Sequence, residues 1–449
     1  MAPGRRTGDR EHPPAEGFER LTDDRHQRVV CHVDMDCFYA ACERLREPAL
    51  RGEPLVVGMG YEADESHGAV ATASYEAREY GVESAMAISE ALELLPRKVD
   101  AAGDPDLDVD EAGFYRPVDL EYYEEVAADV KAALRERADV VREVSIDEAY
   151  LDVTDSVRWG DGAGGGNQAT VEDGQRPTVV EFARDLKERI RETVGVVASV
   201  GVAPTMSAAK VASDHDKPDG LTVVEPGEVR AFLAPLPAEA IHNVGPVTAR
   251  QLRAMGVETA GDLAAADREA LREQFGERGL GVRRFARGED PREVEPVGEP
   301  KSLSRESAFT EATDDPGRKR ERVRGLAVDV ADRARREDAL YRTIGIKVVV
   351  PPFDVNTRAR SLPGPVQDAD LVVETALELL GEFEDTEVRK LGVRVSNLSF
   401  TEDEQASLAG FDADDATDSG ADDAGADSTD RRLADHSGSG WVQTVLSDF

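Results

Sequence analysis

The sequence predicts an α+β protein of several domains, and three observations support this. Short apolar strands alternate with amphipathic helices along most of the 449 residues. The length suits about two to four domains, and hydrophobic residues make up 40% of the chain, which is enough for real cores. Two acidic strands, at residues 29–36 and 144–152, stand at the centre of the prediction because apolar residues flank paired carboxylates in each.

These carboxylates predict a cation site. Asp34 and Asp36 are one residue apart and share a strand face, whereas the adjacent Asp147 and Glu148 can serve one site only if the chain bends there. If the two strands are neighbours, at least three carboxylates meet at one sheet edge and repel each other unless cations fill the space. Hard divalent cations prefer oxygen ligands, and pairs of them about 3.5–4 Å apart perform phosphoryl chemistry. The alternative is that Asp147 and Glu148 form only a polar hairpin tip.

The composition is strongly acidic, with 54 basic and 92 acidic residues and a net charge of −38. Such a charge ordinarily argues against a nucleic-acid partner. Acidic residues spread over the whole chain also suit a cytosol rich in salt, where charges are screened within about 3 Å at 1 M. Cys31, Cys37 and Cys42 fit no common zinc pattern and are expected to be free thiols. Without a long apolar run or a signal-peptide core, we expect a cytoplasmic protein with no membrane partner.

The elements follow in order from apolar periodicity and from Gly and Pro stops. Strands are expected at residues 29–34, 54–58 and 68–73, and helices at residues 38–45, 74–81, 88–95 and 122–137. The acidic residues 100–113 are expected to be loop, and the Gly-rich residues 155–177 a flexible insert. Thr178 caps the next helix, and a strand at 196–202 leads to a helix at 205–216. The central sheet is expected to be mixed or antiparallel, with helices on one face.

The second half changes character. Residues 244–257 resemble a helix-hairpin-helix, whose Gly-containing turn would offer N–H groups to a phosphate; an ordinary helical turn is the alternative. Residues 318–347 hold ten basic and five acidic side chains. This local excess predicts contact with a polyanion or, alternatively, a solvated helix with many ion pairs. Arg358 and Arg360 alternate along a strand, as side chains that follow a nucleic-acid backbone would.

Five segments together resemble the Y-family DNA polymerases, specifically the DNA polymerase IV branch in a haloarchaeal form. They are Val-Asp-Met-Asp-Cys-Phe-Tyr-Ala at 33–40, Ala-Thr-Ala-Ser-Tyr-Glu-Ala-Arg at 71–78, Ser-Ile-Asp-Glu-Ala-Tyr-Leu-Asp at 145–152, Lys-Pro-Asp-Gly at 217–220 and Lys-Ser-Leu-Ser-Arg-Glu at 301–306. Each is weak alone, but their shared order and spacing are specific, and the resemblance covers about residues 29–400.

The resemblance implies a multidomain right-hand polymerase with a palm, short fingers, a helical thumb and a little finger. The domains it implies are a disordered extension at 1–27, a palm at 28–37 and 117–225 with the insert 155–177, fingers at 38–116, a thumb at 226–296 with the helix-hairpin-helix, a little finger at 301–400, an acidic disordered linker at 401–440 and a clamp-binding peptide at 441–449.

By the same resemblance, the carboxylates are the catalytic residues. Asp34 and Asp147 would ligate two Mg²⁺ ions, Glu148 would complete the site, and the Met35 carbonyl could add a ligand. Asp36 is less certain and is assigned a structural role as the alternative. One cation would lower the pKa of the primer 3′-hydroxyl, and the other would hold the triphosphate and the leaving pyrophosphate.

The resemblance also assigns the residues that bind the incoming nucleotide. Tyr39 matches the steric gate that excludes a ribose 2′-hydroxyl, with an ordinary half-buried aromatic as the alternative. Tyr75, Arg78 and Lys217 would bind the triphosphate with help from the Thr72 hydroxyl, since Arg grips phosphate with two hydrogen bonds and Lys acts as a point charge. Arg78 could instead form a surface ion pair. Lys210 could equally be a helix lysine that extends its ammonium into solvent.

The sequence departs from the family at two points and adds a terminal motif. Where relatives often have lysines after the strand at 196–202, this chain has Pro204 and Met206, which puts phosphate contacts there in doubt. The last residues resemble a sliding-clamp-binding peptide of the type Gln-x-x-aliphatic-x-x-aromatic. Its anchor residues are Gln443, Leu446 and Phe449. A flexible tether to a clamp would raise the local concentration of the polymerase at the primer end.

We therefore expect a monomeric, template-directed DNA polymerase that adds dNTPs to a primer 3′-hydroxyl. Its partners would be primer–template DNA, dNTPs and a sliding clamp. Low fidelity and no proofreading follow because polymerase parts account for nearly the whole folded chain; translesion synthesis follows from the resemblance. Two rival interpretations are a two-metal nucleotidyltransferase or cyclase with a palm-like sheet, and a clamp-tethered DNA-binding scaffold without catalysis.

Overall fold

The computed structural model describes residues 28–59, 61, 68–103, 105–160 and 176–400. It contains a five-stranded, a three-stranded and a four-stranded sheet, which confirms the predicted α+β class. The predictions for the N-terminal extension, most of the Gly-rich insert, the acidic linker and the clamp-binding peptide lie outside the described residues. No helix in the described ranges is both long and apolar enough to cross a membrane.

The five-stranded unit carries the acidic strands. Its strand order is β5-β6-β1-β7-β8, with β1 antiparallel to both neighbours and β7 parallel to β8. The strands are β1 (Val30–Met35), β5 (Val140–Glu143), β6 (Glu148–Asp152), β7 (Ala198–Ala203) and β8 (Leu221–Val223). The sheet is mixed, which is one of the two forms expected, and the two acidic strands are neighbours, which is the condition for the predicted cation site.

Helices cover both faces of this sheet, so the expectation of helices on one face is wrong. Residues Cys31, Val33 and Met35 of β1 pack in one core with α5 (Leu120–Arg135) and α6 (Val179–Thr193). Alternation along a strand turns His32 and Asp34 to the other face. That face is covered by α7 (Met206–His215), whose apolar residues join a second core. The polar residues of β1 therefore lie between the sheet and α7.

The three-stranded unit contains the segment between the acidic strands. Its order is β3-β2-β4, with β2 parallel to β4. Its elements are α1 (Phe38–Arg46), β2 (Leu55–Gly58), β3 (Val70–Ala73), α2 (Tyr75–Glu79), α3 (Ile88–Leu94), α4 (Lys98–Ala101) and β4 (Phe114–Arg116). The acidic residues 100–113 include the end of α4 and a single 3-10 turn at Val109–Glu111, so this stretch is not wholly loop.

A helical unit follows the five-stranded sheet and shares its second core. Its helices are α8 (Val229–Leu233), α9 (Pro246–Ala254), α10 (Ala260–Ala265) and α11 (Arg268–Ala286). Gly245 caps α9, and Pro246 occupies the first helical position, where a missing N–H costs no hydrogen bond. The helix α9 is joined to α10 through Gly256 at φ 79°, so the predicted pair of short helices is present.

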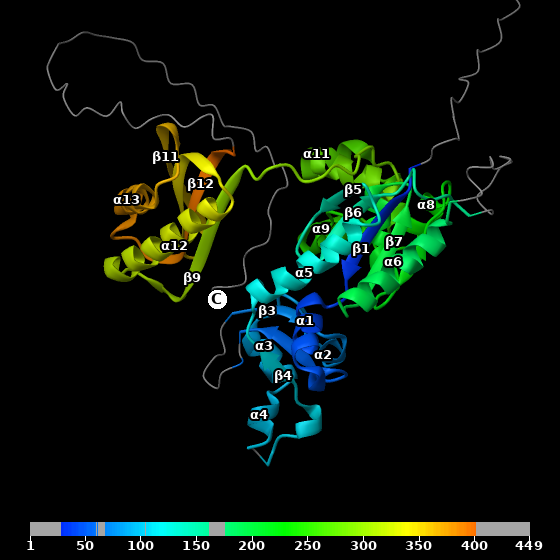
Figure 1. The fold of residues 1–449 in the computed structure, drawn as a ribbon, viewed down its shortest axis with the longest axis horizontal. Coiled ribbons are helices and arrows are strands. Elements are labelled where there is room, and N and C mark those ends of the chain that lie inside the picture. The colour runs from blue at the N-terminus through cyan, green and yellow to red at the C-terminus, as the bar shows by residue number, and fades with distance from the viewer. Residues whose placement is uncertain (1–27, 60, 62–67, 104, 161–175, 401–449) are drawn as a thin grey trace, which may run out of the picture.

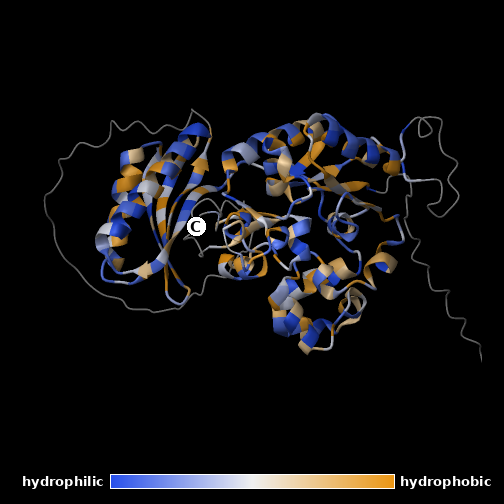
Figure 2. Cartoon of the chain, turned by 90° about the horizontal axis from the view of Figure 1, so that it is seen from below, coloured by the Kyte–Doolittle hydropathy of each residue, from blue (hydrophilic) through white to orange (hydrophobic). Residues whose placement is uncertain are grey.

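The four-stranded unit has its own core and lies to one side of the rest of the chain (Figure 1). All its strands are antiparallel in the order β11-β10-β12-β9. They are β9 (Ser302–Thr313), β10 (Leu340–Val350), β11 (Asp354–Val366) and β12 (Val388–Ser399), with helices α12 (Pro316–Arg336) and α13 (Ala369–Leu380). Figure 2 shows hydrophobic residues along the strands and hydrophilic residues on the helix surfaces. Both helices pack on one sheet face, and no helix in the described residues covers the other, which we call the open face.

A candidate catalytic carboxylate site

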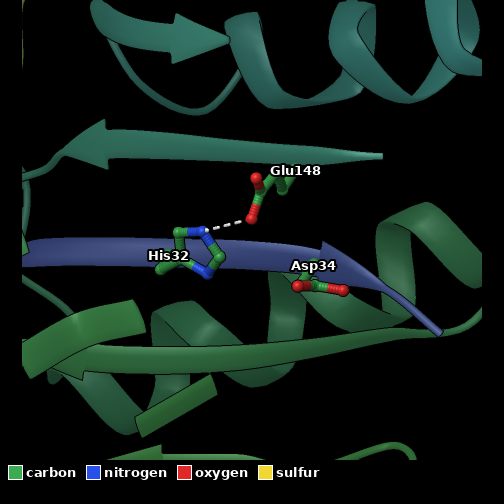
Figure 3. A group of neighbouring side chains, drawn as sticks. All are labelled: His32, Asp34 and Glu148. Atoms are coloured by element: carbon green, nitrogen blue, oxygen red, sulfur yellow. Dashed lines mark ion pairs between the residues drawn. The ribbon is translucent and has the colours of Figure 1, made fainter. Parts of the chain in front are cut away.

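Asp34 and Glu148 face each other across the two acidic strands. The register of β1 against β6 pairs these two residues directly. Ligand atoms of His32, Asp34 and Glu148 all lie within 4.8 Å of one another (Figure 3). His32 and Asp34 come from the same face of β1, and Glu148 is the first residue of β6. The sheet thus brings two carboxylates and an imidazole to one point. The expectation that at least three carboxylates meet is not met among the described residues, because the Asp36 and Asp147 side chains lie outside this cluster.

The chain bends before Glu148, where the sequence requires it. The amides of Val144 and Ser145 both donate to the Glu148 carbonyl, at 3.0 and 3.3 Å. The Asp147 carbonyl accepts a hydrogen bond from the Met35 amide at 3.0 Å. The Asp147 carboxylate accepts from the Ser145 hydroxyl at 2.5 Å and is not one of the three groups in the cluster formed by the described residues. Its backbone is therefore fixed beside β1, with the side chain outside the His32–Asp34–Glu148 cluster.

Two lysines pair with the clustered carboxylates. Lys217 Nζ lies 2.6 Å from Asp34 Oδ1, and Lys210 Nζ lies 2.5 Å from Glu148 Oε2. This ion pair of Lys210 disfavours the solvent-exposed alternative for that residue. Burial raises the pKa of Asp34 to about 6 although Lys217 acts against it. Burial would also raise the pKa of Glu148, but His32 and Lys210 together lower it to about 2.

The donor set fits divalent cations. Asp34 and Glu148 offer oxygen atoms from facing strands, and both already attract a positive group in the form of a lysine ammonium. Buried carboxylates of this kind repel each other unless a cation is near. Oxygen-rich sites of this type suit Mg²⁺, which keeps part of its water shell and takes substrate phosphate as a further ligand. Asp34 and Glu148 would hold such a cation, with Asp147 near enough along the chain to join them.

Asp36 has a structural position. It is 6% exposed, and its carboxylate accepts hydrogen bonds from the Ser199 hydroxyl at 2.9 Å, the Asp219 amide at 2.7 Å and the Tyr75 hydroxyl at 3.2 Å. These donors belong to β7, to the turn before β8 and to α2. The structural alternative for Asp36 is therefore favoured, because its carboxylate joins the five-stranded and three-stranded units and has its acceptor sites used.

Tyr39 stands on α1 next to the carboxylate site. Its ring stacks on Tyr123 of α5, with centroids 4.6 Å apart and an angle of 22° between the planes. Burial, with a smaller contribution from the Asp147 charge, raises the pKa of Tyr39 to about 12. Tyr123 is itself held by a hydrogen bond from its hydroxyl to Glu43 at 2.7 Å. The half-buried Tyr39 ring is thus held in place by its stack on Tyr123. A side chain that contacts a sugar would need this rigidity.

Of the residues expected at the triphosphate, Tyr75 and Arg78 lie on α2 and Thr72 on the preceding β3, whereas Lys217 lies beside Asp34. The Arg78 guanidinium is 4.9 Å from the Tyr75 ring centroid, and Arg78 Nε donates to the Ala73 carbonyl at 3.1 Å. No ion pair of Arg78 is found within the described residues, so its charge stays available to an anion. Thr72 is half-buried at the end of β3. Together these side chains present one cation, one phenol and one hydroxyl within a short span of chain.

The basic residues of the four-stranded unit are less free than the sequence suggests. Lys319 is fully buried, and its ammonium donates to the carbonyls of Phe383, Glu384 and Thr386 at 3.0, 2.6 and 3.0 Å. Arg358 and Arg360 pair with Glu382 and Glu378 beside α13, on the helix-covered side of the sheet. Their predicted role along a nucleic-acid backbone is therefore not supported. The alternative of a helix with many ion pairs accounts for part of the basic excess.

The chain is similar to known proteins over most of its length. The impB/mucB/samB family matches residues 33–214, and its C-terminal domain matches residues 300–408. The chain is 59% identical to the DNA polymerase IV of Halobacterium salinarum, over 88% of this chain and 91% of the relative. It is 40% identical to that of Methanoculleus marisnigri, over 86% and 98%.

Solved structures give the same result. A Y-family DNA polymerase chimera of Dbh and Dpo4 has a TM-score of 0.67 at 28% identity, covering 83% of this chain and all of that one. An insertion ternary complex of the Dbh DNA polymerase has a TM-score of 0.57 at 27% identity with the same coverage. The chain belongs to the Y family of DNA-directed DNA polymerases, in the DNA polymerase IV branch.

Sequence reasoning did not assign His32 to the site. The available signal was its position two residues before Asp34, which places both side chains on one face of β1. Lys210 was considered without a partner, because only the packing of α7 on the sheet shows that it reaches Glu148. The clamp residues Gln443, Leu446 and Phe449 lie outside the described residues.

Proposed function

We propose that this polymerase copies templates by nucleotidyl transfer at the Asp34–Glu148 pair. The observation that carries the proposal is the direct register of these carboxylates across β1 and β6, each beside its own lysine. Asp34, Asp147 and Glu148 hold two Mg²⁺ ions, with the Met35 carbonyl as a further ligand. When bound, the cations activate the primer 3′-hydroxyl and neutralise the charge of the leaving pyrophosphate.

The remaining residues bind and select the nucleotide. Lys217, Arg78 and Tyr75 hold the triphosphate, assisted by the Thr72 hydroxyl. Lys217 changes partner in this step, from Asp34 to a phosphate oxygen, when a cation binds the carboxylate. Tyr39 lies under the sugar and excludes a 2′-hydroxyl, supported by its stack on Tyr123. Low fidelity follows because the three-stranded unit is small and, in this proposal, closes only loosely over the base pair.

We assign the polymerase domains to the observed units. The five-stranded unit is the palm, the three-stranded unit the fingers, the helical unit the thumb and the four-stranded unit the little finger. The DNA partner is supported by the ternary complexes of the similar Dbh polymerase. The C-terminal peptide with Gln443, Leu446 and Phe449 binds a sliding clamp and tethers a monomeric enzyme to the primer end. The chain works in a cytosol of high salt.

Primer extension with Mg²⁺ in about 1 M KCl tests the proposal. Wild type should extend a primer on undamaged DNA and past an abasic site. Asp147→Ala should lose at least about 1,000-fold in rate, because several kcal/mol of transition-state stabilisation disappear. Tyr39→Ala should accept ribonucleotides while keeping deoxynucleotide insertion. A folded wild type without extension would instead support the clamp-tethered scaffold, and highest activity at low salt with inactivation by KCl would exclude the high-salt interpretation.

A further inference from the structure

His32 is a fully buried polar side chain in direct contact with the carboxylate site. Its Nε2 lies 3.3 Å from Glu148 Oε2, and its Nδ1 lies 2.8 Å from the Ser213 hydroxyl on α7. Tyr150 packs against the ring edge to face, with centroids 4.5 Å apart. Figure 3 shows the imidazole directed from β1 towards Glu148. The ring is therefore fixed on three sides by a carboxylate, a hydroxyl and an aromatic ring.

The hydrogen-bond partners indicate which ring nitrogen carries the proton. Ser213 has one hydroxyl proton and lies 2.8 Å from both His32 Nδ1 and the Lys210 carbonyl. Lys210 is inside α7, so the helix itself provides a donor to that carbonyl. The Ser213 hydroxyl nevertheless donates to that carbonyl, so the position of the imidazole proton is inferred from Glu148: a carboxylate only accepts, and a proton on Nε2 makes the contact attractive. Nε2 faces Glu148 Oε2 at 3.3 Å, although this contact is outside hydrogen-bond geometry in the structure.

Both contacts of Glu148 fall on one of its two oxygens. Lys210 and His32 each approach Oε2, at 2.5 and 3.3 Å. No hydrogen bond to Oε1 is present among residues 28–400 as far as the structure describes them, so this oxygen remains for a cation. The lysine ends a flexible side chain, whereas the imidazole is held by its strand and by Ser213. His32 is thus the more permanent of the two restraints on Glu148.

We infer that His32 is a positioning residue, which holds Glu148 Oε2 through Nε2 and so directs Oε1 towards the cation. Ser213 supports it by holding the ring through the contact with Nδ1. The inference rests on the proposed role of Glu148 as a cation ligand. It assigns to the imidazole the task of outer partners at metal sites, whose loss generally weakens metal affinity or activity about 10–100-fold.

Two substitutions separate this role from simple packing. In His32→Gln the amide nitrogen reaches about as far as Nε2 and can still donate to Glu148. In His32→Asn the amide reaches only the position of Nδ1 near Ser213. Mn²⁺ binding to the full chain, followed by electron paramagnetic resonance, should weaken about 10–100-fold in His32→Asn and recover most of this loss in His32→Gln. In single-nucleotide insertion, kcat should follow the same order, with KM for the nucleotide within about two-fold of wild type.

Several outcomes would overturn the inference. Equal loss in both variants, accompanied by equal loss of thermal stability, would show that His32 only fills space. Wild-type Mn²⁺ affinity in a folded His32→Asn protein would show that Glu148 needs no such restraint. Ser213→Ala supplies an independent check, because it should weaken Mn²⁺ binding less than His32→Asn but in the same direction.

A double substitution distinguishes this inference from the proposed function. In a Glu148→Gln background, His32→Asn should cause little further loss, because two residues that act as one unit are not additive. If Glu148→Gln itself keeps full Mn²⁺ binding and activity, the proposed ligand role of Glu148 fails. If Glu148→Gln is inactive and His32→Asn removes the same factor in both backgrounds, the ligand role stands and the positioning inference fails.

Discussion

Two regions of the molecule arrange lysines and carboxylates in opposite proportions. In the five-stranded sheet, Asp34 and Glu148 each have one lysine, and further acidic residues lie nearby. On the open face of the four-stranded sheet, a single carboxylate, Glu306, serves two lysines. Lys347 lies 3.0 Å from Glu306 Oε1, and Lys390 lies 2.7 Å from Oε2.

The geometry around Glu306 depends on a glycine between the two strands. Gly392 of β12 pairs with Glu306 on one side and with Lys347 on the other. A Cβ at this glycine would lie 2.8 Å from Glu306 Cγ. The glutamate side chain therefore lies across β12 and reaches the lysine two strands away. The group of Glu306, Lys347 and Lys390 keeps one surplus positive charge, as a surface for phosphate requires.

The pKa values of Asp34 and Glu306 move in opposite directions. Burial raises the pKa of Asp34 to about 6, so ionising this carboxyl costs free energy in the folded protein. Burial would also raise the pKa of Glu306, but Lys390 and Lys347 lower it overall, so ionising this group stabilises the fold. The negative charge of Asp34 is therefore unfavourable until a cation binds, whereas the negative charge of Glu306 stabilises the fold. The net charge of −38 for the whole chain predicts neither of these local arrangements.

Asp34→Asn should give the largest effect and separate activity from stability. Primer extension should fall at least about 1,000-fold, because a cation ligand is lost. The free energy of unfolding without metal at pH 7.5 should stay equal or rise by up to about 1 kcal/mol, because the buried charge is removed although Lys217 loses a partner. Urea melts in EDTA measure this change. A loss of more than about 1 kcal/mol would mean that the pair with Lys217 stabilises the fold.

Glu306→Gln should have the opposite effect on stability. Two lysines would be left facing each other without a carboxylate, which should cost about 1–2 kcal/mol of unfolding free energy. Primer extension should remain, since no cation ligand changes. Glu311→Gln, an exposed position on the same strand, is the matched control and should change the free energy of unfolding by less than about 0.5 kcal/mol. If both variants had the wild-type free energy of unfolding, the two lysine contacts of Glu306 would not stabilise the fold.

The same variants should show opposite pH dependence. A lowered pKa stabilises the folded state above the unfolded value and loses this effect as pH falls through the folded value, so the difference between wild type and Glu306→Gln should begin to shrink as pH falls below about 4.5. A raised pKa stabilises the protonated form, and this effect is lost as pH rises through the folded value. Any advantage of Asp34→Asn at pH 7.5 should therefore shrink as pH falls through 6 towards 4. Urea melts between pH 4 and 8 would follow both differences, and parallel curves would contradict the comparison.

The sequence was sufficient for the parts of the site that depend on strand periodicity. Apolar alternation predicts the strands β1 and β6, and the adjacent carboxylates Asp147 and Glu148 require the bend before Glu148. Only the register of the structure shows that the two strands are neighbours. It was insufficient where packing from a distant element decides the contact. Lys210 meets Glu148 only because α7 covers the second face of the sheet, and the partners of Asp36 come from three separate elements.

The basic residues of the four-stranded unit show the same limit. Lys319 looks like part of a cationic surface in the sequence, yet it is buried and binds three carbonyls. Arg358 and Arg360 pair in register with Ile346 and Ile344, core residues of β10, and therefore share the helix-covered face. The register of a strand decides which of its two faces binds, and composition alone does not contain the register.

The prediction with the smallest expected effect tests which face of the four-stranded sheet binds DNA. Lys390→Gln, on the open face, should weaken primer–template binding about 3–10-fold and reduce the salt slope of log affinity by about 1, because one phosphate contact is lost. Arg360→Gln, on the helix-covered face, removes the same charge but should change affinity less than about two-fold, since Glu378 neutralises this arginine alone whereas Lys390 shares Glu306 with Lys347. Fluorescence anisotropy at several KCl concentrations gives both numbers. Equal losses would mean that only the total charge of the unit matters, whereas a larger loss for Arg360→Gln would place the DNA beside α13.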